Sequence, residues 1–401
     1  MLLLRNHCDN ILKKVPSYRL LALDVFRGMT IMAMIMVNNP GSWSHIYAPL
    51  RHADWHGWTV TDLIFPFFVF IVGVAISFSI GIQKDQAIPK FKIIQMAAIR
   101  SIKLILLGWF LAIFYYKFGD MNFNWFEDKL LGIRFMGVLQ RIGLVYFCCV
   151  ALFLFIRPKA LILWVLSILT IYGLMMLYLP YSDDTGQIYQ GLLIKGNNLS
   201  AWFDQLVLGS DNVFAKTLPF SFDPEGLLST LPAVATCLTG VLLGSYLQWA
   251  KSINIPLVKQ VGLLSLIGIV TYISGELLQF VIPINKTLWT PSYVLMSSGL
   301  ATLTLALFIY VIDIKKNRRW GAPFIVFGAN AIAFFMFAGI TGRLLVMIPV
   351  ADTQLKNWLY QTIFAPSFGM LNGSLMFAIS FLILSYILMH WMYRNNIFWK
   401  A

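Results

Sequence analysis

The sequence predicts an all-α, polytopic membrane protein with about ten transmembrane helices and both termini in the cytoplasm. Three observations support this fold class. Of the 401 residues, 59% are hydrophobic and only 12% are charged, whereas soluble domains carry about 25% charged residues. Apolar runs of about 20 residues, long enough to cross the hydrocarbon core of a bilayer, recur along the chain. Basic residues are concentrated in alternate connections between these runs, as expected of cytoplasmic loops.

The apolar runs give the expected spans in chain order. They cover residues 20–38, 60–82, 93–116, 135–156, 160–179, 226–248, 257–282, 288–312, 322–342 and 370–392. Residues 1–19 are expected to be a cytoplasmic lead-in, because they are rich in Lys and Arg and lack a long apolar run. Residues 20–401 are expected to form a single transmembrane domain, because no soluble-type segment of domain length interrupts the spans.

The basic residues orient these spans. They precede the first span, lie between the second and third and between the fourth and fifth, and follow the sixth, eighth and tenth: Lys13, Lys14, Arg19, Lys84, Lys90, Lys92, Arg157, Lys159, Lys251, Lys315, Lys316, Arg318, Arg319, Arg394 and Lys400. Because these connections alternate, we expect them in the cytoplasm and the others, including the long loop 180–225, in the periplasm. A loop of that length often builds or covers a site.

Charge and cysteine content argue against several other classes of protein. The formal charge of +13 reflects 30 basic and 17 acidic residues. We attribute it to topology and anionic lipid rather than to nucleic acid, because no basic run is interleaved with a nucleic-acid-binding motif. The four cysteines include no CxxC pair, so we expect neither a disulfide framework nor a metal site: Cys8, Cys148, Cys149 and Cys237.

Polar side chains inside the spans predict a hydrated interior. Such residues are costly in hydrocarbon and usually mark a pathway or a site. They are Asp24, Arg27, Gln140, Arg141, Glu276 and Asn330. Asp24 and Arg27 lie one helical turn apart, so pairing with each other is an equally good interpretation of these two. A polar cavity is compatible with both a transporter and a membrane enzyme.

The segment RHADWHGWTVTDLIFPFFVFIVG (51–73) places His52, His56 and Asp62 at the start of a span. Histidine titrates near neutral pH and therefore suits proton transfer. Together with His45 the spacing is H-x6-H-x3-H, which lacks a clear fourth ligand, so we do not expect zinc. The tryptophans near these loops fit the aromatic belt of a membrane interface: Trp55, Trp58 and Trp289.

Six segments carry a family resemblance. They are ALDVFRGMTIMAMIMVNNPG (22–41), the segment 51–73, GVLQRIGLVY (137–146), FDPEGLLSTLPA (222–233), NKTLWTPSYVL (285–295) and GANAIAFF (328–335). In this order, from about residue 19 to the end, the chain resembles the heparan-α-glucosaminide N-acetyltransferase family, whose bacterial members are inner-membrane proteins. The resemblance implies an enzyme that takes an acetyl group from cytosolic acetyl-CoA and delivers it to a glucosamine-type amino sugar on the other membrane face.

The resemblance also implies an active-site residue. The family's histidine matches His52, and the W-x-G-x-T-x-x-D-L-x-F-P pattern after it matches Trp55, Gly57, Thr59, Asp62 and Pro66. The family's nearby asparagine matches Asn38, with the adjacent Asn39 as the alternative register. The chain lacks the additional luminal N-terminal region of the lysosomal enzyme, so we expect an acceptor other than lysosomal heparan sulfate. The lysosomal relatives imply a homodimer.

Acetyl transfer needs a base for the attacking amine or hydroxyl, because N- and O-acetylation are both open, and a group that stabilises the thioester oxyanion. His52 is expected to be that base or a covalent acetyl carrier, while Asn38 or Asn39 donates to the oxyanion and Asp62 orients the imidazole. We assign three basic residues to the phosphates of acetyl-CoA: Arg27, Arg141 and Lys251. We assign a further set to the acceptor cavity and its mouth: Asp24, Asp223, Glu276, Lys286 and Asn330.

Two other functions remain open at this point. A transporter of a sugar or small anion is compatible with the intramembrane charges, but the chain shows no clear internal repeat of the kind common in transporters. A non-catalytic envelope scaffold leaves the His52 segment and the charges within the spans without a reason.

Overall fold

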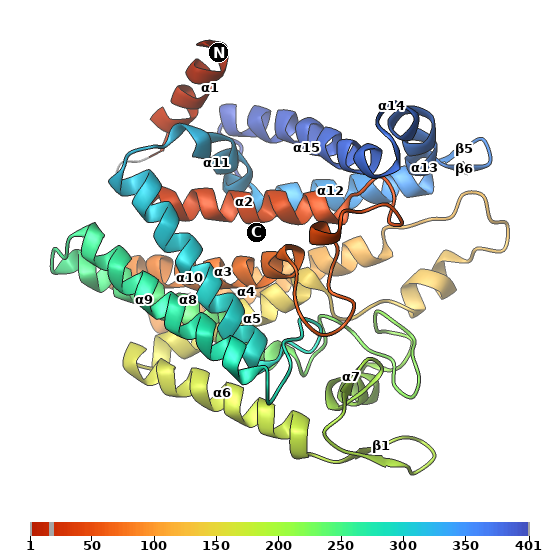
Figure 1. The fold of residues 1–401 in the computed structure, drawn as a ribbon, viewed down its shortest axis with the longest axis horizontal. Helices are drawn as coiled ribbons and strands as arrows, with labels where there is room; N and C mark the ends of the chain where they lie inside the picture. Colours follow the sequence, from red (N-terminus) through yellow and green to blue (C-terminus); the bar gives the residue numbers. More distant parts are fainter. Residues whose placement is uncertain (1, 16–19, 400–401) are drawn as a thin grey trace.

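The computed structural model, which describes residues 2–15 and 20–399, confirms an all-α polytopic membrane fold. In these residues nine helices are long and apolar enough to cross a membrane, or up to ten if one bent pair is a single span. The nine are α2 (Leu21–Asn38), α3 (Val60–Asp85), α4 (Lys90–Ile113), α5 (Val138–Phe155), α6 (Pro158–Tyr178), α8 (Thr230–Ser252), α9 (Leu257–Leu278), α10 (Pro291–Phe308, continued by the π-turn η3, Ile309–Ile314) and α15 (Met370–Arg394). They run roughly side by side along the horizontal of Figure 1.

The ninth expected span, 322–342, is not one straight helix. It is divided into α11 (Ala322–Ala329) and α12 (Ala331–Met347), which meet at Asn330 with a bend of 73°. The Asn330 side chain is fully buried, where its Nδ2 donates to the Ile397 carbonyl at 2.9 Å and its Oδ1 accepts from the Trp399 N–H at 3.0 Å. The amide therefore joins the break to the C-terminal segment, and the expected ninth span corresponds to this bent pair of helices.

The predicted lead-in contains a helix, α1 (Leu2–Lys13), which packs against α11 near one end of α15. Ile11 is buried, and the His7 Nε2 lies 2.8 Å from the Tyr386 hydroxyl of α15. Two of the basic residues used for topology, Arg19 and Lys400, lie outside the described residues.

Burial distinguishes the central helices of the bundle from the peripheral ones. In the apolar window of α8, 72% of the residues are buried, whereas the corresponding share in α9 is 17%. Glycines let α8 approach α3 closely, because a Cβ on Gly240 would lie 2.1 Å from the Phe70 carbonyl oxygen and one on Gly73 would lie 1.9 Å from the Cys237 carbonyl oxygen. Small residues commonly permit such packing between membrane helices. The α3–α8 pair therefore forms the centre on which the site described below is built.

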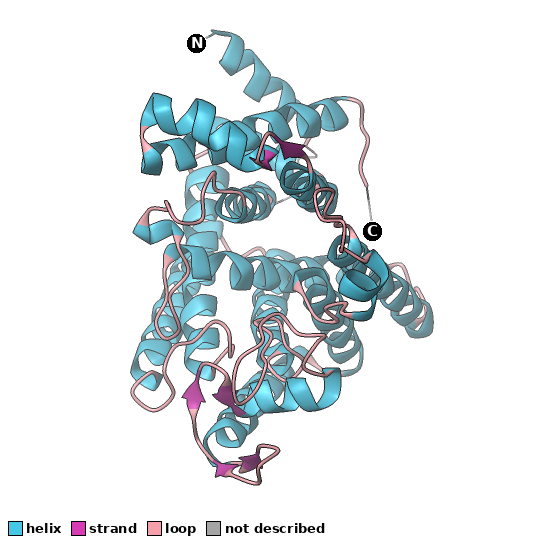
Figure 2. Cartoon of the chain, turned by 90° about the vertical axis from the view of Figure 1, so that its right-hand side faces the viewer, coloured by secondary structure: helices cyan, strands magenta, loops and turns pink. Residues whose placement is uncertain are grey.

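The structure outside the spans gathers mainly at one end. The expected loop 180–225 forms two short antiparallel hairpins and a helix, β1 (Tyr181–Ser182) with β2 (Ile188–Tyr189), β3 (Leu193–Ile194) with β4 (Asn197–Asn198), and α7 (Leu199–Leu208). Residues 181–220, here called the outer unit, have their own apolar cluster, which includes Tyr181, Leu199 and Phe220 and packs against Tyr172 of α6. Its hairpins lie at the bottom of Figure 2.

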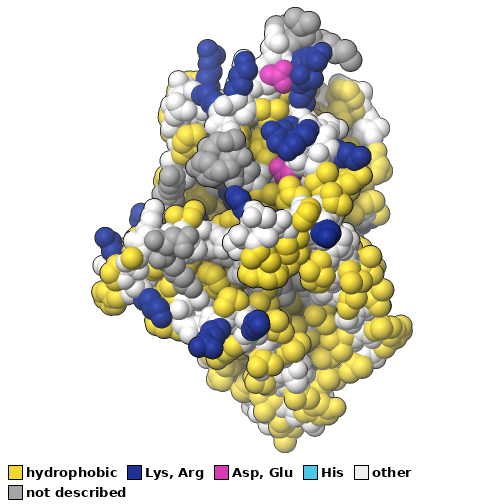
Figure 3. All heavy atoms as spheres, turned by 90° about the vertical axis from the view of Figure 1, so that its left-hand side faces the viewer, with side chains coloured by type: hydrophobic (Ala, Val, Ile, Leu, Met, Phe, Trp, Pro, Cys, Tyr) yellow, Lys and Arg dark blue, Asp and Glu magenta, His cyan; other side chains and the backbone are white. Residues whose placement is uncertain are grey.

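Shorter elements complete the connections between the spans. They are η1 (Ala48–Leu50), the π-turn η2 (Phe126–Leu131), η4 (Arg319–Gly321), the hairpin β5 (Pro349–Val350) and β6 (Thr353–Gln354), α13 (Leu355–Leu359), the π-turn η5 (Tyr360–Phe364) and α14 (Ala365–Phe368). The end of the bundle opposite the outer unit carries many Lys and Arg side chains and few acidic ones (Figure 3). This asymmetry favours the predicted orientation, which stays a prediction.

The close approach of α3 and α8 makes a stability prediction. Gly240→Ala should lower the midpoint of thermal unfolding in detergent, because its Cβ meets the backbone of α3, and overpacking costs about 1–3 kcal/mol. Gly262→Ala is the matched control, since a Cβ at that helical position of α9 meets nothing within 4 Å. Equal unfolding midpoints for the two variants would contradict the proposed packing.

Candidate active site

The site is built around a histidine–aspartate pair at the start of α3. His52, in the loop between η1 and α3, has its Nδ1 2.6 Å from the Asp62 Oδ1 in the first turn of that helix. The Asp62 side chain is 2% exposed and that of His52 is 47% exposed. Because an ionised carboxylate only accepts hydrogen bonds, this contact assigns the imidazole proton to Nδ1. The lone pair of Nε2 is then available at the half-exposed edge of the ring.

The second oxygen of Asp62 organises the same loop. Its Oδ2 accepts from the backbone N–H groups of Ala53 and Thr59, each at 3.0 Å, and from the Thr59 hydroxyl at 3.2 Å. An acidic residue in the first turn is favourable at the positive end of a helix. Gly57 permits the turn between these contacts, because its φ of +91° lies in the region that side chains disfavour. The W-x-G-x-T-x-x-D pattern therefore describes a loop that folds onto its own carboxylate.

Lys286 approaches this pair from the connection between α9 and α10. Its Nζ lies 3.0 Å from the His52 Nδ1, 3.4 Å from the His52 Nε2 and 3.5 Å from the Asp62 Oδ1. Burial lowers the pKa of Lys286, although the nearby Asp62 and Glu225 carboxylates oppose this effect. A cationic group that sheds its proton more readily than an exposed lysine thus lies beside the imidazole.

Backbone contacts hold the Lys286 connection against the His52 loop. Asn285 donates from Nδ2 to the Trp55 carbonyl at 2.8 Å, and the Gly57 N–H donates to the Ile284 carbonyl at 2.8 Å. Trp55 in turn donates from its indole N–H to the Leu193 carbonyl of β3 at 2.7 Å. The two loops and the outer unit are therefore joined in one network.

An acidic turn before α8 adds a second charged group. Arg134 Nε donates to the Asp223 Oδ2 at 2.7 Å, and its Nη2 contacts both the Asp223 Oδ1 and the Glu225 Oε2. Burial alone would raise the pKa of Glu225, but the cations Arg134, Arg141 and Lys286 reverse that effect and lower it. Glu225 is therefore held as a carboxylate within the electrostatic range of Lys286.

Arg141 of α5 lies beneath this turn and is fully buried. Its Nη2 donates to the Gly226 carbonyl at 3.0 Å and contacts the Ser229 hydroxyl. Its guanidinium carbon lies 5.0 Å from the centroid of the Trp289 ring, a cation–π arrangement. Nε and Nη1 have no hydrogen-bond partner among the residues that the structure describes. Arg141 thus faces the acidic turn rather than the lipid.

The expected belt role of Trp289 is wrong. Its side chain is 1% exposed and donates from Nε1 to the Thr236 hydroxyl at 3.0 Å. Tyr293, which packs edge-on against Trp289, donates its hydroxyl to the Asp62 carbonyl at 2.6 Å. The tryptophan is part of the buried floor of the site, because it covers the guanidinium of Arg141.

Of the residues predicted from sequence, the structure brings His52, Asp62 and Lys286 into direct contact. Asp223 lies on the adjacent acidic turn, and Arg141 of α5 contacts that turn. Asn38 is different. It is the exposed last residue of α2, and within the described residues it forms no hydrogen bond to the His52–Asp62 pair. Asn39 donates back to the Ile35 carbonyl of its own helix at 2.8 Å.

The remaining predicted residues lie in other settings. Asp24 and Arg27 approach each other at 3.7 Å near the start of α2. Lys251 is in the last turn of α8, about 30 Å along the helix from the acidic turn at a rise of about 1.5 Å per residue. Glu276, on the peripheral helix α9, accepts from the Gln279 amide at 2.8 Å. Asn330 binds the C-terminal segment, as described above.

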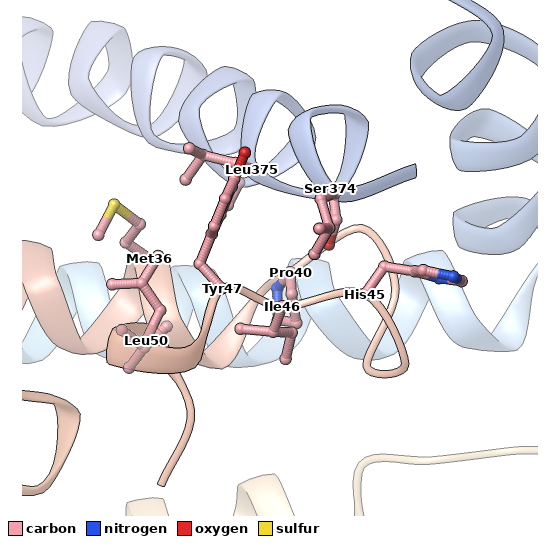
Figure 4. Close-up of a pocket in the computed structure, with 11 residues that line it drawn as sticks. Met36, Pro40, His45, Ile46, Tyr47, Leu50, Ser374 and Leu375 are labelled. Carbon is pink, nitrogen blue, oxygen red and sulfur yellow. The ribbon is translucent and has the colours of Figure 1, made fainter. Parts of the chain in front are cut away.

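A separate small pocket lies between the end of α2 and α15, and Figure 4 shows its lining. It is mainly apolar, with Met36, Pro40 and Leu375 among its residues. His45, in the loop that follows α2, also belongs to the lining, but its ring points away from the labelled side chains of α15 in this view. In the part of the chain that the structure describes, no three or more His, Cys, Asp or Glu residues are grouped so that they could hold a metal ion.

Sequence reasoning missed several residues of the site. Arg134, Asn285, Tyr293 and Glu225 received no catalytic or binding role from the sequence. The sequence signal for Arg134 was its position in a loop predicted to be periplasmic, where basic residues are less common. A paired acidic Asp-Pro-Glu turn on the same side was its natural partner.

Comparison with known proteins identifies relatives along nearly the whole chain. No protein-family model matches it. It is 30% identical to the heparan-alpha-glucosaminide N-acetyltransferase of Homo sapiens in an alignment 426 residues long, which covers 95% of this chain and 60% of the human protein. The corresponding protein of Mus musculus is 28% identical over 432 residues, covering 97% of this chain and 61% of the mouse protein. The chain thus spans about three fifths of the length of these relatives, and its similarity to them along nearly its whole length supports the resemblance to the heparan-alpha-glucosaminide N-acetyltransferase family.

Proposed function

We propose that the protein is a transmembrane acetyltransferase that moves an acetyl group from cytosolic acetyl-CoA to a glucosamine-type amino sugar on the non-cytoplasmic side. The observation that carries the proposal is the 2.6 Å contact between the His52 Nδ1 and the Asp62 Oδ1 at one end of a membrane bundle, from which we assign the proton to Nδ1 and the lone pair to Nε2. The names of the two relatives support the reaction class. The resemblance to bacterial inner-membrane members supports that membrane as the location, and the expected homodimer stays a prediction.

Two routes use the same pair. In the direct route, the nitrogen of the acceptor amine attacks the thioester carbonyl while Nε2 of His52 accepts the proton that this amine loses. CoA then leaves as the thiol. In the two-step route, Nε2 attacks the carbonyl first and CoA leaves as the thiolate. The acceptor amine then takes the acetyl group from the imidazole, and the freed Nε2 accepts the proton that the amine loses. Asp62 has the same task in both routes, because it holds the ring and stabilises the positive charge that develops on it.

Lys286 is the group best situated to stabilise the oxyanion. Its Nζ is 3.4 Å from Nε2, so the negative oxygen of a tetrahedral intermediate formed at that nitrogen would lie within its field. Asn38, for which the sequence predicted the oxyanion role, forms no hydrogen bond to the His52–Asp62 pair within the described residues. We therefore propose Lys286 for this role. We keep Asp223 for the acceptor and add Glu225, because the ammonium and hydroxyl groups of an amino sugar suit carboxylates.

The donor phosphates require basic residues elsewhere. Arg27 and Lys251 remain our proposals, since both lie toward the predicted cytoplasmic half of their helices. Arg141 fits less well as a phosphate ligand, because its Nη2 is already bound to the acidic turn. We assign it instead to the support of that turn.

The bend at Asn330 favours a transporter as the second candidate, because broken helices often form transport sites. The polar groups of Asn330 are bound by Ile397 and Trp399, however, and this pairing leaves the amide committed to the chain itself. Saturable sugar uptake by vesicles, without transfer of label from acetyl-CoA, would support the transporter and sink the enzyme.

The first functional prediction concerns His52. Purified protein incubated with labelled acetyl-CoA and a panel of amino sugars should transfer label, and His52→Ala should lower the rate by about 10²–10⁴-fold, the usual contribution of a general base. His45→Ala and His56→Ala are the matched controls and should retain activity. Label trapped on the wild-type protein after quenching would identify the two-step route. An inactive His56→Ala with an active His52→Ala would refute the assignment.

A second prediction tests the orientation of the ring. Asp62→Asn should reduce kcat by about 10²–10⁴-fold with a smaller effect on KM, because the amide can present its N–H to Nδ1 and so favour the wrong tautomer. Asp54→Asn, in the same loop but exposed, provides the control. The measurement is steady-state acetyl transfer with both substrates varied. Wild-type kcat in Asp62→Asn would remove Asp62 from the mechanism.

The pH dependence of transfer tests Lys286. Burial lowers the pKa of Lys286, so as pH rises its ammonium is lost earlier than that of an exposed lysine, and transfer should fall on the alkaline side. Lys286→Arg should extend the active range to higher pH, since a guanidinium stays charged, whereas Lys286→Met should be slow at every pH. Lys216→Arg, at an exposed position of the outer side, is the control. An unchanged alkaline limb in Lys286→Arg would exclude this role.

A further inference from the structure

The helix α7 of the outer unit reaches the acidic turn through one buried carboxylate. Asp204 is 1% exposed, and its Oδ1 accepts from the backbone N–H of Leu227 at 2.8 Å and from that of Leu228 at 3.3 Å. These N–H groups belong to the turn that precedes α8 and would otherwise be unsatisfied at the helix start. A side chain from the outer unit therefore caps the turn that carries Glu225.

Gly226 lies between Asp204 and Arg141. On one side, a Cβ at position 226 would lie 1.8 Å from the Asp204 Oδ2, so the carboxylate packs directly against the glycine. On the other side, the Gly226 carbonyl accepts from the Arg141 Nη2 at 3.0 Å and from the Thr230 hydroxyl at 2.7 Å. The peptide next to Glu225 is thus held from two directions.

The position of this turn affects the mouth of the site. Glu225 is adjacent to Gly226 in the chain and pairs with Arg134, and its charge acts on Lys286 beside His52. A shift of the turn would therefore move a carboxylate that we propose for the acceptor. It would leave the His52–Asp62 contact unchanged, because that contact lies within another loop.

The Asp204 carboxyl titrates in the physiological range. Burial raises its pKa to about 7, against the lowering effects of the Leu227 and Leu228 N–H groups and of Arg141, while Asp223 adds to the rise. Tyr172 of α6 is the other titratable group within its electrostatic range. The Asp204 Oδ2 is buried and has no hydrogen-bond partner among the described residues. The fold therefore favours the neutral acid, and ionisation leaves a buried charged oxygen unpaired.

We propose that Asp204 is a positioning residue that sets the affinity of the site for its acceptor by holding the 223–228 turn, and that it loses this hold when it becomes charged. The inference rests on the proposed acetyltransferase function. Its sign follows from the unpaired Oδ2, because a charge there draws in water or moves the turn. The KM for the amino sugar should rise between pH 6 and pH 8, while kcat follows His52 and Lys286.

The test compares Asp204→Asn with wild type at pH 6 and pH 8. The asparagine keeps an oxygen for the Leu227 and Leu228 N–H groups and cannot ionise, so its acceptor KM should stay near the wild-type value at pH 6 across this range. Wild-type KM should rise several-fold over the same interval. Asp204→Ala, which loses both hydrogen bonds, should have a raised KM at both pH values. Asp211→Asn, an exposed residue that pairs with Lys216, should follow wild type.

A second measurement does not depend on acetyl transfer. Amide exchange of the 225–230 segment, corrected for the intrinsic effect of pH, should be faster in wild type at pH 8 than at pH 6 and should not change in Asp204→Asn. If wild type transfers no acetyl group to any amino sugar, the proposed function fails and the exchange result alone decides the role of Asp204. Equal exchange in wild type at both pH values, or superimposable KM profiles for wild type and Asp204→Asn, would overturn the proposal.

Discussion

The buried carboxylate of Asp62 is the constraint on which the site depends. A charge removed from water at the start of a membrane helix must be bound by donors, because an unpaired one is strongly unfavourable. Asp62 meets this need with its own loop, through the N–H groups of Ala53 and Thr59 and the ring of His52. The requirement that stabilises the carboxylate therefore also closes the loop and orients the imidazole, so that local folding and the geometry of the proposed catalytic pair have the same cause.

Distant segments are then fixed to this loop by a few buried bonds. Asn285 links the Lys286 connection to Trp55, and Trp55 reaches the outer unit at Leu193. From below, Tyr293 donates to the backbone of Asp62 itself. The helices α3, α8 and α10 supply a rigid base for these loops, since glycines bring α3 and α8 into close contact. The site is thus made of loops but does not share the mobility of free loops, because each loop is bound to a packed helix or to another loop.

The sequence predicts the spans well, because apolar length is a local property that each segment carries by itself. It does not predict the bend at Asn330, where the side-chain amide pairs with residues 397 and 399, which only the folded chain brings close. The same distinction applies to the site. His52 and Asp62 share one local pattern and were found, whereas the pairing of Arg134 with Glu225 joins positions 91 residues apart and was missed. Trp289 was misplaced because indole rings suit both a membrane interface and a buried cation, and composition does not distinguish the two.

Charge balance explains why the outer unit matters to the bundle. At the mouth of the site the cations Arg134, Arg141 and Lys286 face the carboxylates Asp62, Asp223 and Glu225, so these groups compensate each other. Asp204 is the additional acid beneath them, and burial raises its pKa to about 7. While it is neutral the cluster stays balanced, and when it ionises the cluster gains a negative charge that has no partner of its own. A compact arrangement of compensated charges in low dielectric responds strongly to one added charge. We therefore expect such a site to depend on a carboxyl from the outer unit, even though the atoms that we propose to react lie on the loops of the bundle.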